Sequence, residues 1–249
     1  AVMTKIRTVG HIMMYELLMN IRNKWVLGFS IGFALLALGV SYFGMALIGY
    51  EVEFQDFYRM VASLLNMVIY LIPVVALVMG VNSLCIERGT MDMLLAQPVS
   101  RSQVFLGKIG GLYITLFITT MVGLGTPGII IALKSGYDGM WKYLIFALLC
   151  LAMAAMFVSI SALTSILVRG KTKALVITLL LWVFFVLFYD LIVFALSYYM
   201  VDERYLRTML YFSLLANPVD IIRVLTLMII GGASALGPAG AGLIRQFGG

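Results

Sequence analysis

The sequence predicts an all-α integral membrane domain, and three observations indicate it. Five long apolar runs fill most of the 249 residues, the charged residues lie almost entirely between the runs, and 63% of residues are hydrophobic against 11% charged. Ordinary soluble domains carry about 25% charged residues. Each run is long enough to cross about 30 Å of hydrocarbon as a helix, which satisfies its own backbone polar groups in lipid. The runs cover approximately residues 25–49, 61–86, 111–133, 143–168 and 174–199.

Residues 1–24 are expected to form an interfacial helix ahead of the first span. Ile6, Val9, Met13, Leu17 and Ile21 recur at helical spacing and define one apolar face. A basic amphipathic segment in this position suits the cytoplasmic surface of a membrane. A frayed, charged terminus is the alternative.

The net charge of +6 does not indicate nucleic acid as a partner, because its distribution follows membrane topology. Lys and Arg are concentrated in residues 1–24, in the 87–108 loop and in residues 169–173, whereas most acids lie in the other connecting segments. The positive-inside rule then places the N-terminus in the cytoplasm. No linker divides the chain, so we expect a single domain over residues 1–249, in the bacterial inner membrane, with the first run as an uncleaved entry segment.

Smaller features refine the five spans. Pro73 in the second run predicts a kink, and the sequence from Gly123 to Gly128, which contains Pro127, predicts a bent or unwound end to the third. Cys85 and Cys150 fall at different depths, so both are expected to be free thiols.

The segment 201–249 is expected to lie outside. Asn217 can cap a helix that begins at Pro218, and Asp220 lies in its first turn, where the partial positive charge of the helix N-terminus favours an acid. We expect one or two surface or partly re-entrant helices over 205–231, with Asn217, Pro218, Asp220 and Arg223 facing an outer partner. A sixth span here is the alternative, at the cost of several charges in the bilayer. The Gly- and Ala-rich residues 232–249 are expected to lead into a missing final span.

Asp190 is the acid that lies well inside a run. An isolated carboxylate there is costly, so we expect it to have a partner or to face protein or water. Two interpretations remain open. One is a gate, a substrate contact or a partner switch in a translocation path, and the other is a structural hydrogen bond to a neighbour such as Asn66 or Tyr189.

The loop between the second and third runs, residues 87–108, has a pattern typical of a short amphipathic helix. Gly89 ends the incoming span, Pro98 ends the short helix, and Ser100 can cap the next helix near Arg101. The apolar face of the short helix consists of Met91, Leu94 and Leu95. A cytoplasmic partner could bind such a helix, although an ordinary connecting loop is the commoner case.

This loop resembles the cytoplasmic loop of ABC-2 type transporter permeases. The matching residues are Glu87, Arg88, Gly89, Thr90, Leu94, Leu95, Pro98, Ser100, Arg101, Gly107 and Lys108. The loop departs from the family pattern where Gly89 and Thr90 directly follow Glu87 and Arg88. The interfacial helix and the order of spans resemble the same family. Residues 217–221 and 188–191 are similar, more narrowly, to its NosY branch, which serves nitrous oxide reductase.

The resemblance implies a fold like that of type V ABC exporters, with six spans and a second copy of the chain. It implies that residues 87–101 form a coupling helix lodged in a separate ATPase, which carries ATP and Mg. For the NosY branch it implies a NosF-like ATPase, a NosD-like periplasmic partner and a role in supplying the copper-sulfur site of nitrous oxide reductase. Export of a drug, lipid or polysaccharide is the alternative, as is a scaffold that relays motion without passing a solute.

No catalytic or metal constellation is found in the sequence. Residues 165–172 resemble a phosphate loop, but Ser165 replaces its first Gly and a membrane run precedes it instead of a strand. The 17 Met residues have no repeated short spacing, and His11 is the single His. We therefore expect a non-catalytic subunit without a cofactor or metal of its own.

Overall fold

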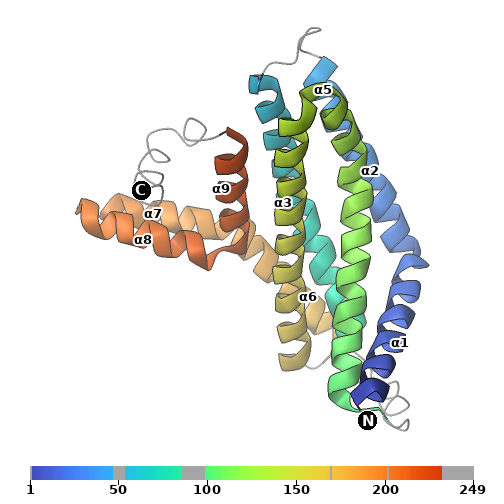
Figure 1. The fold of residues 1–249 in the computed structure, drawn as a ribbon. Helices are drawn as coiled ribbons and strands as arrows, with labels where there is room; N and C mark the ends of the chain where they lie inside the picture. Colours follow the sequence, from blue (N-terminus) through green and yellow to red (C-terminus); the bar gives the residue numbers. More distant parts are fainter. Residues whose placement is uncertain (1, 47–53, 86–98, 169, 201, 232–249) are drawn as a thin grey trace.

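The described part of the chain is helical throughout. The structure, a computed structural model, describes residues 2–46, 54–85, 99–168, 170–200 and 202–231 (Figure 1). The helices are α1 (Val2–Ile21), α2 (Lys24–Ala46), α3 (Phe54–Leu84), α5 (Arg101–Leu167), α6 (Lys171–Val183), the π-helical segment η1 (Phe184–Phe188), α7 (Tyr189–Tyr199), α8 (Glu203–Ala216) and α9 (Pro218–Gly231). The all-α expectation is confirmed.

Five apolar stretches within these helices are long enough to cross a membrane, as the sequence predicts. They are Lys24–Tyr42, Phe57–Leu84, Arg101–Ile130, Tyr137–Leu167 and Lys171–Tyr199. The third and fourth form the two arms of α5, which turns back on itself between them (Figure 1). The hydroxyl of Tyr113 on the first arm donates to the carbonyl of Ala155 on the second at 3.3 Å. The α5 hairpin is therefore held together by packing and by polar contacts between its arms.

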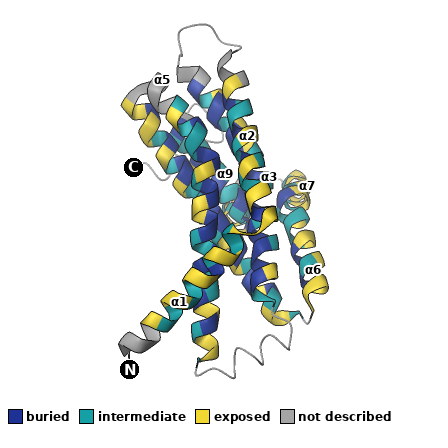
Figure 2. Ribbon diagram, turned by 90° about the vertical axis from the view of Figure 1, so that its right-hand side faces the viewer, coloured by how far each residue is buried: buried dark blue, intermediate teal, exposed yellow. Residues whose placement is uncertain are grey.

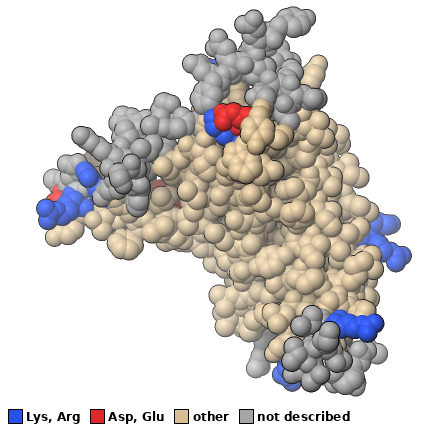
Figure 3. All heavy atoms as spheres, viewed as in Figure 1, with Lys and Arg blue, Asp and Glu red and all other residues tan. Residues whose placement is uncertain are grey.

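α3 is the centre of the bundle. Its apolar side chains are buried along most of the helix length, including Leu64, Val68 and Leu77, each at 0% exposure. α5 packs against α3 most extensively, and α2, α6 and α9 surround it. Large apolar side chains remain exposed on α2, α5, α6 and α7, where lipid can cover them (Figure 2). Figure 3 shows the result as a broad uncharged surface with charges toward its margins.

α1 packs side by side with the first turns of α5. Three glycines on α5 make this approach possible, because a Cβ on Gly107 or Gly111 would lie 2.6 Å from Ile12 or Glu16, respectively. The opposite side of α1 leaves several apolar side chains exposed: Met14, Tyr15, Leu18 and Met19. The helix ends at Ile21, before the expected residue 24, because Asn23 Oδ1 accepts the Trp25 N–H at 3.0 Å and begins α2. The frayed-terminus alternative is wrong for residues 2–21.

Of the two expectations for the end of the third run, unwinding is wrong, since α5 stays helical through Gly123–Gly128. A bend is present just beyond it, where α5 turns back on itself between Ile130 and Tyr137 (Figure 1). Proline cannot donate to the carbonyl four residues earlier, which here belongs to Gly123. Thr126 Oγ1 lies 3.4 Å from that carbonyl oxygen and takes the place of the missing donor. The Tyr143 hydroxyl adds a 2.6 Å hydrogen bond to the Leu124 carbonyl. Pro73 likewise lies inside the continuous helix α3.

We predict that Gly123→Ala destabilises the protein and that Gly125→Ala does not. A Cβ at residue 123 would overlap the ring of Phe33, which is 1% exposed, whereas nothing lies within 4 Å of one at residue 125. Overpacking costs about 1–3 kcal/mol, while alanine in an open helical site gains about 0.5–1 kcal/mol over glycine. Thermal unfolding of the two variants in detergent measures the difference, and equal midpoints would contradict this packing.

Candidate functional site

The fifth span contains a π-helical interruption just before Asp190. Residues 184–188 form η1, so the span runs from α6 through η1 into α7. Single π-turns are rare in proteins as a whole, but those that occur often lie at functional sites. A π-turn leaves carbonyl groups displaced from regular helical pairing, and here the Asn217 side chain donates to the Phe185 carbonyl at 2.9 Å. The interruption is thus bonded to the junction between α8 and α9.

Asn217 organises that junction. It is completely buried, its Oδ1 accepts the Val219 N–H at 3.0 Å, and its Nδ2 also donates to Asp220 at 2.8 Å. Pro218 occupies the first position of α9, as predicted, and needs no N–H donor there. The two helices meet at 103°. Both polar atoms of the Asn217 side chain are thus hydrogen-bonded, and the start of α9 lies against the fifth span.

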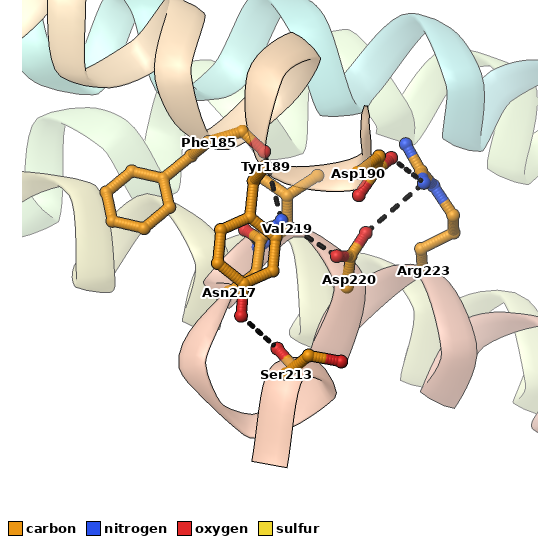
Figure 4. A network of polar contacts seen from close by, with 8 residues as sticks. All are labelled: Phe185, Tyr189, Asp190, Ser213, Asn217, Val219, Asp220 and Arg223. Atoms are coloured by element: carbon orange, nitrogen blue, oxygen red, sulfur yellow. Dashed lines mark hydrogen bonds and ion pairs between the residues drawn. The ribbon is translucent and has the colours of Figure 1, made fainter. Parts of the chain in front are cut away.

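Arg223 connects two carboxylates at this position. Its Nη1 lies 3.1 Å from Asp190 Oδ2 and 3.2 Å from Asp220 Oδ1 (Figure 4). The Tyr189 hydroxyl donates to the Ser213 carbonyl of α8 at 2.7 Å. We call Tyr189, Asp190, Asn217, Asp220 and Arg223 the junction cluster. Two carboxyl groups thus share a single guanidinium, and burial raises the pKa of Asp220 to about 6.

The structure unites residues that the sequence placed in two separate groups, one within the span and one outside. Asp190 has a partner, as expected, but the partner is Arg223. The suggested partners Asn66 and Tyr189 are wrong: Asn66 is exposed on α3, and Tyr189 bonds Ser213. Asn217 does not face an outer partner, because its side chain is buried and bonded within the chain. For α8 and α9 the structure shows two helices that meet at a sharp bend, as in the first expectation; a sixth span here would be broken at this bend.

A second polar cluster lies at the other end of the bundle and was missed by sequence reasoning. Glu16 of α1 is 7% exposed and accepts hydrogen bonds from Ser83 Oγ at 2.5 Å and Asn20 Nδ2 at 3.2 Å. Lys108 Nζ lies 3.2 Å from Glu16 and donates to the Ser83 carbonyl at 2.8 Å. We call Glu16, Asn20, Ser83 and Lys108 the loop-flanking cluster. A signal was present, because Glu16 continues the helical face of Val9 and Met13.

We named the loop-flanking cluster after the loop that contains the expected coupling segment. Glu87, Arg88, Gly89, Thr90, Met91, Leu94, Leu95 and Pro98 lie outside the described residues. On the described side, Ser100 caps α5 as predicted: its Oγ accepts the Gln103 N–H at 3.3 Å, and the Gln103 side chain accepts the Ser100 N–H at 2.9 Å. α5 begins at Arg101, so the loop joins the end of α3 to the start of α5 beside Glu16.

The phosphate-loop-like sequence at residues 165–172 has no phosphate-loop context. α5 ends at Leu167 and α6 begins at Lys171, with Gly170 at a positive φ of 103° in the turn. A helix-to-helix turn replaces the strand-to-helix turn that such a motif requires. Across the described ranges, no group of three or more His, Cys, Asp or Glu side chains could hold a metal ion. Cys85 and Cys150 are both free thiols, as expected.

We predict that Arg223→Met destabilises the protein by about 1–3 kcal/mol, since it leaves the carboxylates of Asp190 and Asp220 without their cation. Arg204→Met is the matched control, because Arg204 is exposed near the start of α8. Adding Asp190→Asn to Arg223→Met should recover part of the loss, as expected for coupled neighbours. Unfolding midpoints in detergent test this, and indistinguishable effects of the two arginine changes would contradict the role of the junction cluster.

Comparison with known proteins agrees with this architecture. The family model described as "ABC-2 family transporter protein" matches residues 11–243. Two curated proteins are each named "Probable ABC transporter permease protein NosY". The one from Stutzerimonas stutzeri is 32% identical over 92% of this chain and 85% of its own length. The one from Pseudomonas aeruginosa is 32% identical over 89% and 82%, respectively. The chain is a membrane protein that belongs to the ABC-2 family of transporter permeases.

Proposed function

We propose that this chain is the membrane subunit of an ABC system in which two copies pair with two separate, NosF-like ATPase subunits in the bacterial inner membrane. ATP and Mg are bound by the ATPase, and this chain contributes no catalytic group. The system exports a solute, or transmits motion to a NosD-like periplasmic protein, during copper-site maturation of nitrous oxide reductase. Support for this narrower role comes from the two relatives named NosY and from residues 188–191 and 217–221.

The observation that carries the proposal is the loop-flanking cluster. The two helices that enter and leave the 87–98 loop are both bonded to Glu16 of α1, through Ser83 and Lys108. Glycines 107, 110 and 111 bring the α1 and α5 backbones close together beside these bonds. An ATPase that displaced the loop would thus act on three helices held together, and not on a flexible connection.

The junction cluster favours the relay as a second candidate function. It bonds the fifth span to α8 and α9, so a tilt of that span would move the outer helices with it. In this function Asp190, Asp220 and Arg223 set the position of α9, and no solute needs to pass. A transport assay in sealed vesicles separates the relay from export of a drug, lipid, polysaccharide or sulfur compound.

The proposal requires the 87–98 loop to face the cytoplasm. We predict that a cysteine introduced by Gln97→Cys, with Cys85→Ala and Cys150→Ala, reacts with a membrane-impermeant maleimide in inverted vesicles but not in intact cells. A cysteine at Arg59, at the start of the second span, should show the opposite pattern. Reaction of the Gln97 variant in intact cells would reverse the topology and remove the coupling function.

We predict that Glu87→Gln with Arg101→Gln reduces permease-dependent ATP hydrolysis to the level of the ATPase alone, because both residues belong to the expected ATPase contact. Lys108→Met should leave the ATPase bound but abolish the transport-linked response, since it breaks the loop-flanking cluster behind that contact. Arg59→Gln, at the opposite end of α3, is the control. ATP hydrolysis and copurification of the complex in liposomes measure both steps.

Full ATP hydrolysis in the Glu87→Gln, Arg101→Gln variant would overturn the coupling assignment. Loss of ATPase binding in the Lys108→Met variant would show that the cluster shapes the docking surface itself. Both outcomes are distinct from misfolding, which size-exclusion chromatography of each variant detects.

A further inference from the structure

A cavity of about 770 Å³ lies between α3 and the junction of α1 with α2. Its lining changes from polar to apolar along the direction of the spans. Its polar rim consists of Asn20, Asn23, Lys24 and Asn82, and its deeper wall consists of apolar residues that include Gly28, Phe29, Val75 and Val78. The rim coincides with the beginning of the first span at Lys24 and the end of the second at Leu84. Polar groups thus lie at the membrane surface, with apolar groups at the depth of acyl chains.

The rim is positively charged and has hydrogen-bond donors available. Lys24 and Asn82 are exposed, and neither side chain has a hydrogen bond or ion pair with another residue in the described ranges. Asn23 uses its Oδ1 to accept from Trp25, so its NH₂ group is left to donate elsewhere. Glu16, which accepts a hydrogen bond from Asn20 at the rim, is paired with Lys108.

Trp25 and Gly28 adapt this cavity to a membrane setting. Trp25 is 87% exposed, and tryptophan is enriched at the headgroup level of bilayers. Gly28 leaves space in the wall, because nothing lies within 4 Å of a Cβ built there. In Figure 3, Lys and Arg side chains project from the right-hand edge, at the height where α1 meets α2 in Figure 1.

We propose that this cavity binds one anionic phospholipid from the leaflet on the α1 side of the membrane, with its phosphate at Lys24 and an acyl chain along Gly28 and Val78. The volume falls within the usual range for ligand sites, and basic pockets between spans recognise anionic headgroups. A second copy of the chain is a poorer occupant. A twofold contact centred here would bring the Arg22 and Lys24 charges of both copies together. The site shares Asn20 with the loop-flanking cluster, but the proposed phosphate contact at Lys24 does not rest on the coupling function.

The test uses Trp25 as a reporter in the full chain. Trp141→Phe and Trp182→Phe remove the other tryptophans, and the protein is reconstituted into phosphatidylcholine bilayers with increasing brominated phosphatidylglycerol or brominated phosphatidylcholine. We expect Trp25 to be quenched at a lower mole fraction of the anionic lipid. Lys24→Gln should raise that fraction about fivefold, the effect of one basic residue near an anionic surface. Lys171→Gln, an exposed lysine at the same end of the bundle, should leave it unchanged.

A second pair of variants tests the cavity instead of the charge. Gly28→Leu should fill the wall and reduce quenching, whereas Gly39→Leu, on the same helix and also with nothing within 4 Å, should not. Equal quenching by both lipids, or equal effects of Lys24→Gln and Lys171→Gln, would overturn the proposal. Absence of quenching by either lipid would show that protein covers the cavity, which also overturns it.

Discussion

The bilayer's demand that polar groups be satisfied within the protein determines how this chain is assembled. Helices meet the demand for the backbone, but charged side chains need partners from other segments. Glu16 and Lys108 are 92 residues apart, and Asp190 and Arg223 are 33 residues apart. Each pair ties a membrane span to a helix outside the five spans, α1 in the first case and α9 in the second. The polar contacts therefore determine where the peripheral helices attach.

The two attachments are connected through the core of the bundle. α9 buries Val219, Ile222 and Ile230, and it packs against α3 and α5. α3 and α5 are also the helices that α1 joins at the loop end. A packed route thus runs from the loop-flanking cluster along α3 and α5 to α9 and the junction cluster. This route gives a displacement of the loop a continuous set of contacts through which to act.

Local sequence patterns predicted the parts of the structure that depend on single segments. The spans, the Ser100 cap and the start of α9 at Pro218 all follow from hydrophobic runs and helix-end chemistry. The partners of Asp190 and Glu16 could not be predicted in this way, because each partner lies on a distant segment and single-sequence spacing does not encode such contacts. Pro127 was misleading for a related reason. Its effect on the helix depends on Thr126 and on Tyr143 from the other arm of α5, which supply hydrogen bonds that the proline removes.

The ion pair of Asp190 bears on whether this residue is structural or functional. Ion pairs contribute little net stability when they are exposed to solvent, as the Asp190 side chain partly is, and well-packed apolar residues often replace buried ones without loss. A purely structural need would also be met by one carboxylate for one guanidinium, whereas Arg223 is shared by Asp190 and Asp220. The Asp190 side chain is 43% exposed and that of Asp220 16%, so the less accessible acid is held within α9 and the more accessible one comes from the span. The Asp190–Arg223 contact is therefore the more solvent-accessible of the two contacts that Arg223 makes. The greater exposure of Asp190 agrees better with the functional interpretation of this residue than with a purely structural ion pair.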